Sequence, residues 1–220
     1  MPHPNISRTM ADTNLSPLAC GHAAPGADAT IAATRAWLEK AVIGLNLCPF
    51  AKTVHVHGRI RYCFSIATTP EALLEQLACE LLDLKAADAA IVETTLLIHP
   101  YVLDDFLEFN EFLQAVDDLV AGLDLDGEFQ VASFHPNYQF ADSLPEDIEN
   151  YSNRSPYPTL HLLRETSIER AVATFPDAAD IYERNIVTLR RLGHDGWQRL
   201  FEPFPKEAPA ELPAIVGLKP

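Results

Sequence analysis

Two histidines in this chain are each followed directly by proline, at the end of an apolar segment. His99 precedes Pro100, and His135 precedes Pro136. Both segments are predicted to be strands. If these strands are parallel, the two imidazoles emerge at one edge of the sheet, where open α/β sheets bind ligands. Neutral imidazoles side by side suit an acid–base pair or a divalent metal ion. The alternative is that each histidine only caps its strand and binds a loop carbonyl.

A second group of reactive side chains lies between residues 150 and 165. His161 and Glu165 are four residues apart in an expected helical turn, so the carboxylate can orient the imidazole or share a metal with it. Arg154 and Arg164 suit a carboxylate or phosphate group, because a guanidinium binds such groups bidentately. The alternative is that both arginines hold backbone carbonyls of a long loop.

Amide and ammonium groups add to these candidates. Asn150 and Asn153 can donate N–H groups to a ligand, or they can form the Asx turns that stabilise a loop. Lys52 is a basic candidate outside the loop. We expect Asn153 and Lys52, together with the two arginines, to bind the anionic part of a small molecule.

Cys48 and Glu93 are further candidates for catalysis. Cys48 lies at a predicted helix boundary, where a helix dipole stabilises a thiolate, although a small buried hydrophobic role is the alternative. Glu93 lies inside an apolar segment, and a buried carboxylate needs a partner. It is expected either to pair with Arg or Lys or to act as a general base with a raised pKa.

Residues 48–52 resemble the start of the active site in omega-type glutathione transferases and glutaredoxins. Those enzymes place a strand before the cysteine, whereas here a helix is predicted before it. The second cysteine of a CxxC pair is also missing. A thiol oxidoreductase that uses Cys48 is therefore one alternative function.

The spacing of apolar residues predicts the elements that position these groups. A first helix is expected from about residue 28 to 45, and residues 54–66 are expected to form a bent strand or short hairpin, with His55 and His57 facing one side. Thr69 and Pro70 begin a helix that runs to about residue 84. Two further strands are expected at residues 89–98 and 129–134. Between them, Asp104 and Asp105 open an acidic helix that Gly122 ends. A capping box at Thr166–Glu169 begins a short helix, and a last helix is expected at residues 177–192 with Gly193 as its C-cap.

This order of elements predicts an α/β fold with a small mixed or partly parallel sheet. A ferredoxin-like α+β fold is the alternative, because short helices also connect antiparallel strands. Residues 28–202 are expected to form a single globular domain. Residues 1–27 are expected to be a disordered tail, and residues 203–220 a proline-rich tail.

Charge and hydropathy exclude several classes of function. The net charge is −15, and Lys85 is the one base among many acids between residues 69 and 149. Binding to nucleic acid or to an anionic membrane needs a basic face, so neither partner is expected. No apolar run reaches the roughly 18 residues of a membrane span, and the N-terminal residues lack the features of a secretory signal. The spacing of the four cysteines is no disulfide framework, so a reducing cytoplasm is the expected location.

Several motifs together resemble one known family, the domain of unknown function numbered 1415, which is found mainly in bacteria. The resemblance covers roughly residues 29 to 200 and implies a single domain, but it implies no particular activity. It places the distinctive family positions on Cys48, His135, Arg154, His161, Arg164 and Glu165. The motifs that carry it are Gly44–Phe50, Glu93–Thr94, Ala132–Pro136, Asn153–Pro158 and His161–Glu165.

These candidates predict an enzyme that acts on a small anionic metabolite. His135 and His161 would be the acid–base groups or, together with His99, the metal ligands, and Glu93 or Glu165 would assist them. Cys48 would line the pocket or act as a thiol. A divalent metal is the cofactor that this set suits. A second alternative is a non-catalytic binding or assembly protein whose loop is a rigid docking surface.

Overall fold

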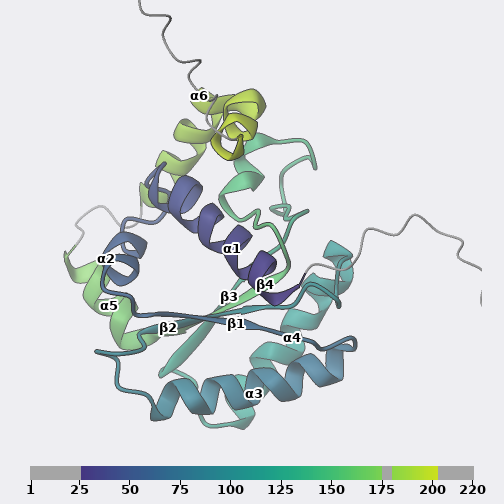
Figure 1. Ribbon diagram of the computed structural model, residues 1–220, viewed down its shortest axis with the longest axis vertical. Coiled ribbons are helices and arrows are strands. Elements are labelled where there is room, and N and C mark those ends of the chain that lie inside the picture. Colours follow the sequence, from purple (N-terminus) through teal and green to yellow (C-terminus); the bar gives the residue numbers. More distant parts are fainter. Residues whose placement is uncertain (1–25, 175–179, 203–220) are drawn as a thin grey trace, which may run out of the picture.

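The computed structural model describes residues 26–174 and 180–202 (Figure 1). The expected C-terminal tail, nearly all of the expected N-terminal tail and the expected helix start at residue 177 lie outside these residues. Among the described helices, none combines the length and the apolar character needed to cross a membrane.

A mixed sheet of four strands lies at the centre of the fold. The strands are β1 (Ile60–Phe64), β2 (Thr94–Ile98), β3 (Phe129–Phe134) and β4 (Thr159–Arg164), in the order β1-β2-β4-β3. β1 and β2 are parallel, whereas β4 runs antiparallel to both of its neighbours, β2 and β3. The predicted α/β class with a mixed sheet is confirmed. The antiparallel ferredoxin-like alternative is wrong because of the parallel β1–β2 pair.

Two long helices cover one face of this sheet, which we call the α3/α4 face (Figure 1). α3 (Pro70–Ala86) connects β1 to β2, and α4 (Phe106–Gly122) connects β2 to β3. Both connections move in the same direction across the sheet, so both helices reach the same face. The predicted caps are confirmed. Thr69 accepts a hydrogen bond from the Ala72 N–H, and Asp105 accepts from the N–H groups of Leu107 and Glu108.

Large apolar side chains fill the α3/α4 face. Each fully buried leucine or phenylalanine contributes about 1.5–3 kcal/mol to folding, so this layer supplies much of the driving force. The helices contribute Leu73, Leu77, Leu81, Leu84, Phe109, Phe112, Val116 and Val120, and the strands contribute Leu97, Phe129, Leu160 and Leu162.

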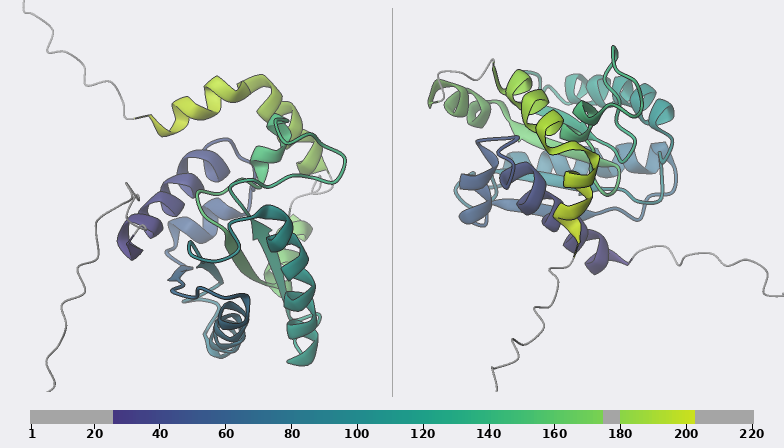
Figure 2. Two further views of the ribbon diagram at one scale, coloured as in Figure 1. Left: turned by 90° about the vertical axis from the view of Figure 1, so that its right-hand side faces the viewer. Right: turned by 90° about the horizontal axis from the view of Figure 1, so that it is seen from above.

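The opposite face is covered by α1 (Ala27–Trp37), and we call it the α1 face. α1 continues without a break into the wider π-helical turn η1 (Leu38–Ile43), and the short helix α2 (Ala51–Val56) follows. α6 (Ile181–Phe201) lies on this side as well, and its Trp197 and Leu200 pack against the cluster around Trp37 (Figure 2). The remaining elements are the 3-10 turn η2 (Ile148–Ser152) and α5 (Glu165–Thr174).

Four local predictions are wrong. Residues 159–164 form strand β4 and not a helical turn, because both sides of this segment pair with strands of the sheet. His55 lies in helix α2 and His57 caps its end, so they do not alternate on a strand. Gly193, with a φ of 65°, kinks α6 but does not end it. The capping box is not formed at the expected place, since α5 already begins at Glu165.

Candidate functional site

His99 and His135 meet at one edge of the sheet, as the sequence predicts. β2 and β3 run in the same direction because both are antiparallel to β4. Both imidazoles lie on the α3/α4 face, where they contact the ring of Phe109 at centroid distances of 5.7 and 5.1 Å. Neither side chain is exposed to solvent. The edge is therefore closed by α4.

Hydrogen bonds join both imidazoles to the loop before α4, although Nε2 of His99 is buried without a partner. His99 Nδ1 donates to the carbonyl of Val102 at 3.1 Å, and His135 Nε2 donates to that of Leu103 at 3.2 Å. His135 Nδ1 accepts from the backbone N–H of Asn137. Leu103 has a φ of 59°, a conformation that is costly for leucine, and the histidines hold the loop in it. Both residues thus stabilise a strained loop.

Burial keeps both rings neutral. Desolvation lowers the pKa of His99 to about 4, and it also lowers the pKa of His135. Within residues 26–174 and 180–202 no three His, Cys, Asp or Glu side chains gather as metal ligands require. His161, the third expected ligand, lies on the other face of the sheet. The residues present therefore do not fit the divalent metal that the sequence suggests.

Arg154 and the two asparagines stabilise the long loop after β3. Arg154 donates to the carbonyls of Tyr138, at 3.1 Å, and Pro145, at 2.5 Å, and its guanidinium lies over the Tyr151 ring. The fully buried Asn150 side chain accepts from the Phe140 N–H and donates to the Leu144 carbonyl. The Asn153 side-chain oxygen accepts from Ser152, and its backbone carbonyl accepts from the His135 N–H.

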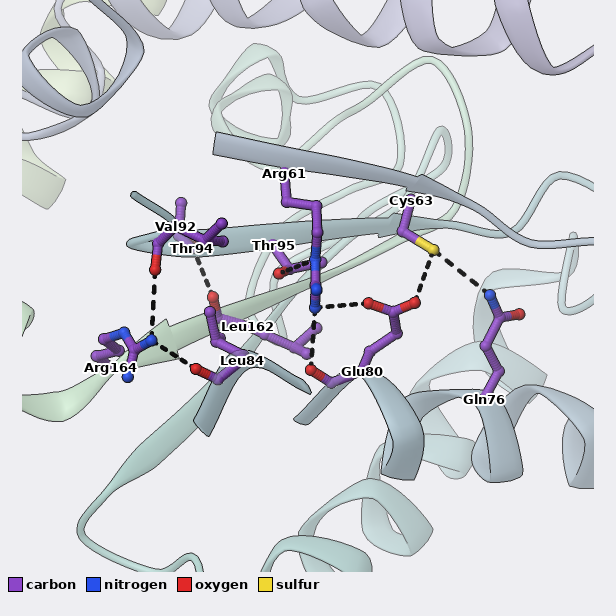
Figure 3. A network of polar contacts seen from close by, with 10 residues as sticks. All are labelled: Arg61, Cys63, Gln76, Glu80, Leu84, Val92, Thr94, Thr95, Leu162 and Arg164. Atoms are coloured by element: carbon purple, nitrogen blue, oxygen red, sulfur yellow. Dashed lines mark hydrogen bonds and ion pairs between the residues drawn. The ribbon is translucent and has the colours of Figure 1, made fainter. Parts of the chain in front are cut away.

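Arg164 stabilises the end of α3 from the α3/α4 face (Figure 3). Its guanidinium donates to the carbonyls of Leu84, Ala87 and Val92 at 2.5, 2.8 and 3.3 Å. Leu84 and Ala87 lie at the C-terminal end of α3, where carbonyls run out of helical N–H donors, and Leu84 also accepts from the Ala87 N–H at 3.2 Å. Neither Arg154 nor Arg164 is arranged to hold an anionic substrate.

The carboxylates and Lys52 lie apart from these histidines. Glu93 forms an ion pair with Arg59 at 2.6 Å, which matches the paired alternative for this buried residue. Glu165 begins α5 while His161 is in the sheet, so the expected helical pairing is not formed. Lys52 is exposed on α2. Neither the Glu165 nor the Lys52 side chain forms an ion pair with another residue that the structure describes.

On the α3/α4 face, a polar network that the sequence does not predict joins β1 to α3 (Figure 3). Arg61 forms an ion pair with Glu80 at 2.7 Å, and the Cys63 thiol donates to the same carboxylate. Gln76 in turn contacts the Cys63 sulfur. Burial and the adjacent Glu80 raise the pKa of Cys63 to about 12, so its thiol stays protonated. This network packs the edge strand against α3.

His161 combines an unpartnered ring nitrogen with partial exposure, whereas the unpartnered Nε2 of His99 is fully buried. His161 lies in the middle of β4, opposite Leu96 of β2 and Ala132 of β3, and it points to the α1 face. The Thr94 hydroxyl donates its single proton to the carbonyl of Leu162 at 2.5 Å. The contact of 2.8 Å between Thr94 Oγ1 and His161 Nε2 must therefore be an N–H donation from the histidine. This fixes the tautomer and leaves Nδ1 as a lone-pair acceptor.

The surroundings of His161 are dry but not closed. Desolvation lowers its pKa to about 4, so the ring is neutral at physiological pH. Its neighbour Phe134 lies at a centroid distance of 6.1 Å and packs edge-on against Trp37 of α1 at 5.2 Å. Even so, the His161 side chain remains partly exposed, although it lies in an inner strand.

Small and polar side chains explain this opening. Small or polar residues interrupt the buried side of α1 and η1, whereas the buried stripe of α3 is entirely leucine. The buried residues of α1 and η1 are Thr30, Thr34, Trp37, Leu38, Ala41 and Val42. The sheet presents Thr94, His161 and Ala132 to the same face. Such side chains cannot fill the space between a helix and a sheet in the way that leucines do.

Several buried polar atoms on the α1 face have no partner among the described residues. They are the hydroxyl of Thr30, the indole nitrogen of Trp37 and the hydroxyl of Tyr62 in β1. Burying such a group without a hydrogen bond costs about 1–3 kcal/mol, and folded proteins rarely leave one in this state. The α1 face thus leaves hydrogen-bonding capacity unused among the described residues.

Cys48 lies at the border of the same face. It packs against the cluster of Trp37, Leu38, Ala41 and Val42, just before α2. Burial raises its pKa, although N–H groups of Phe50 and Ala51 act in the opposite direction. The thiol is therefore protonated at neutral pH, which does not suit the nucleophile of a thiol oxidoreductase.

The sequence predicted His161 and Cys48 but not the residues that surround them. Thr30, Trp37 and Tyr62 belong to no motif, and Thr94 enters only through the Glu93–Thr94 motif of the family resemblance. The one available signal was the threonine spacing in the first helix, since Thr30 and Thr34 share a face with Trp37.

The fold and this face define the class of protein. It is an α/β protein whose mixed four-stranded sheet carries the larger apolar core on one face, and the Trp37 cluster together with His161 and Thr94 on the other. The chain belongs to the family described as "Protein of unknown function (DUF1415)", whose model matches residues 29–199. No curated protein and no solved structure shows a match to the chain.

Proposed function

We propose that this protein is an enzyme that binds a small molecule between α1 and the sheet and transfers a proton through His161. One observation carries the proposal. Thr94 binds His161 Nε2 and so directs the unpartnered Nδ1 lone pair to a partly exposed position on the α1 face. A fixed tautomer with a free nitrogen is what a general base needs, because the base must be oriented before it receives a proton.

The family motifs support the same face. Residues 44–50 supply Cys48, residues 93–94 supply Thr94, and residues 161–165 supply His161. Residues 132–136 add Ala132 and Phe134. Segments far apart in the sequence therefore contribute to one place, which favours a shared role in binding or chemistry over separate structural roles.

The anionic substrate that the sequence predicts loses its physical basis. That expectation depended mainly on Arg154 and Arg164, which donate to backbone carbonyls instead. The proposal therefore keeps proton transfer by a histidine and leaves the metal and the two arginines out of the reaction. His135 and His99 act as residues that position the loop before α4.

A comparison of variants in a metabolite extract tests the proposal. The purified full-length protein is incubated with a small-molecule extract, and mass spectrometry follows which compounds are consumed or formed. His161→Gln places an amide nitrogen near the position of Nε2, keeps the bond to Thr94 and removes Nδ1. We expect a conversion that wild type performs and that this variant slows by about 10²–10⁴, the usual contribution of a general base.

His57→Gln is the matched control. His57 is exposed at the end of α2 and binds only the Thr53 carbonyl, so this variant should keep the full rate. A conversion that survives in His161→Gln would contradict the proposal. Absence of any conversion by wild type would contradict it as well.

Non-catalytic binding is the second candidate function, and a specific observation favours it. Arg154, Asn150 and His135 hold the loop between β3 and β4 rigidly through backbone carbonyls and N–H groups. A rigid loop is a suitable docking surface because little conformational entropy is lost on binding. Capture of a protein partner that is lost in Arg154→Gln, without any conversion of small molecules, would support this candidate.

A further inference from the structure

The unpartnered groups on the α1 face describe the molecule that they would bind. The indole of Trp37 can only donate a hydrogen bond, His161 Nδ1 can only accept one, and the hydroxyls of Thr30 and Tyr62 can do either. Trp37 is 2% exposed and Thr30 is fully buried, so bulk water does not satisfy them. A ligand must therefore both accept and donate hydrogen bonds.

Among the residues that the structure describes, the charged side chains that act on this set lie at its border. Burial raises the pKa of Tyr62 and Cys48 and lowers that of His161, so all three are neutral at pH 7. Arg35 lies over the Tyr62 ring at 4.4 Å, on the exposed side of α1. Glu39, one turn later on the helix, acts on Tyr62 with the opposite sign. The border therefore carries charges of both signs, and Arg35 has the larger effect on Tyr62.

An uncharged lining disfavours a charged ligand. A charge loses its hydration when it enters such a layer, and only a paired charge of opposite sign compensates for that loss. The aromatic rings of Trp37, Phe134 and Tyr62 instead provide flat apolar surfaces beside the hydrogen-bonding groups. This combination suits a planar polar molecule.

We infer that the molecule held on the α1 face is an uncharged planar compound of the amide, lactam or nucleobase type. Its carbonyl accepts from the Trp37 indole, and its N–H donates to His161 Nδ1. The inference rests on the proposed function, because it names the class of substrate for that same site. It replaces the anionic metabolite as the expected ligand.

Nuclear magnetic resonance of the ¹⁵N-labelled full-length protein tests this class directly. The chain has two tryptophans, so the indole N–H signals of Trp37 and Trp197 serve as probe and internal control. Trp197→Phe assigns them. Three small probes of similar size and different charge are titrated, namely 2-pyrrolidinone, acetate and ethylammonium. We expect 2-pyrrolidinone to shift the Trp37 signal saturably, with an affinity at least tenfold higher than that of either ion.

A matched pair of threonine variants locates the binding. Thr30→Val keeps the shape of the side chain and removes an unpartnered hydroxyl, so it should weaken 2-pyrrolidinone binding about threefold or more. The Thr34 hydroxyl already donates to the Thr30 carbonyl at 2.9 Å, so Thr34→Val should leave the affinity unchanged. Equal losses in both variants would overturn the assignment of this hydroxyl to the ligand.

Two other outcomes would overturn the inference. A preference for acetate or ethylammonium would show a charged class of ligand, and an unmoved Trp37 signal with every probe would show that only water occupies this face. The proposed function can fail independently of the inferred ligand class. Binding of 2-pyrrolidinone without any conversion that depends on His161 would contradict catalysis but support the ligand class. Conversion of an anionic compound that depends on His161 would support catalysis but contradict the ligand class.

Discussion

Arg164 shows how a basic side chain in a distinctive motif can stabilise the fold by donating hydrogen bonds to backbone carbonyls. It donates to the carbonyls of Leu84, Ala87 and Val92, which follow or end α3. A hydrogen bond to a charged group contributes about 1.5–3 kcal/mol, and unpaired carbonyls in a partly buried position are costly. Arg154 is used in the same way in the loop after β3.

Arg164→Gln should therefore lower the free energy of unfolding by about 2–4 kcal/mol, because a single amide cannot reach three carbonyls. Urea denaturation followed by circular dichroism measures the change. Arg191→Gln on the exposed side of α6 is the control and should change stability by less than about 0.5 kcal/mol. Unchanged stability of Arg164→Gln would return this residue to the substrate-binding candidates.

The junction of α1, η1 and α2 shows how a helix is widened beside the proposed site. η1 is a π-helical turn, and such turns occur frequently at functional sites. It ends at Gly44, whose backbone approaches that of Lys40 closely, so a Cβ at this position would lie 2.2 Å from the Lys40 carbonyl oxygen. The next residues lead to Asn46, with a φ of 55°, and to Cys48. Gly44 thus permits the path that brings Cys48 to the α1 face.

Gly44→Ala should destabilise the protein by about 2 kcal/mol or more, because backbone atoms must move to admit the methyl group. Gly122→Ala at the end of α4 is the matched control, since nothing lies within 4 Å of the added Cβ and alanine favours a helix. Its stability should be equal or slightly higher. Thermal unfolding of both variants decides the matter, and an intact Gly44→Ala variant would show that η1 does not depend on this glycine.

Elements with strong local signals were predictable from the sequence. β3 was predicted with its true ends, and α3 and α4 were predicted from their caps and apolar spacing. β4 was missed because Thr159–Arg164 is a short apolar run after a proline, and its strand structure comes from pairing with β2 and β3. α2 was missed because six residues with two valines and a threonine carry little helical signal.

The site was only partly predictable for the same reason. His161 was identified by its chemistry, but its partner was expected to be Glu165, one helical turn away. Insertion of β4 between β2 and β3 instead places it beside Thr94 and on the face opposite His135. No local pattern records which face a strand residue takes when its neighbours come from distant segments. The arrangement under α1 therefore needed the structure.

At the level of the whole molecule, buried neutral histidines make stability depend on pH. Burial lowers the pKa of His99 and His161 to about 4 in the folded protein, below the ordinary value near 6.5. Above about pH 6.5 neither the folded nor the unfolded chain binds these protons. Between about pH 6.5 and 4 only the unfolded chain takes them up, so acid favours unfolding.

The free energy of unfolding should consequently fall by up to about 3 kcal/mol for each histidine between pH 7 and pH 4. Urea denaturation at several pH values measures the slope. His99→Asn keeps an amide donor near the position of Nδ1 for the Val102 carbonyl and cannot take up a proton, so its slope should be shallower. An identical slope in this variant would contradict the lowered pKa of His99.

The rate at which a reagent modifies each histidine tests whether a small molecule can enter the α1 face. Diethyl pyrocarbonate acylates neutral imidazoles that it can reach, and peptide mass spectrometry reports the rate at each position. We expect His161 to react in the folded protein more slowly than the exposed His57 but at least tenfold faster than the fully buried His99 and His135. Ala132→Leu, which fills space opposite His161, should suppress that reaction. Protection of His161 equal to that of His135 in the wild-type protein would mean that the α1 face is packed, and no site for a small molecule would exist there.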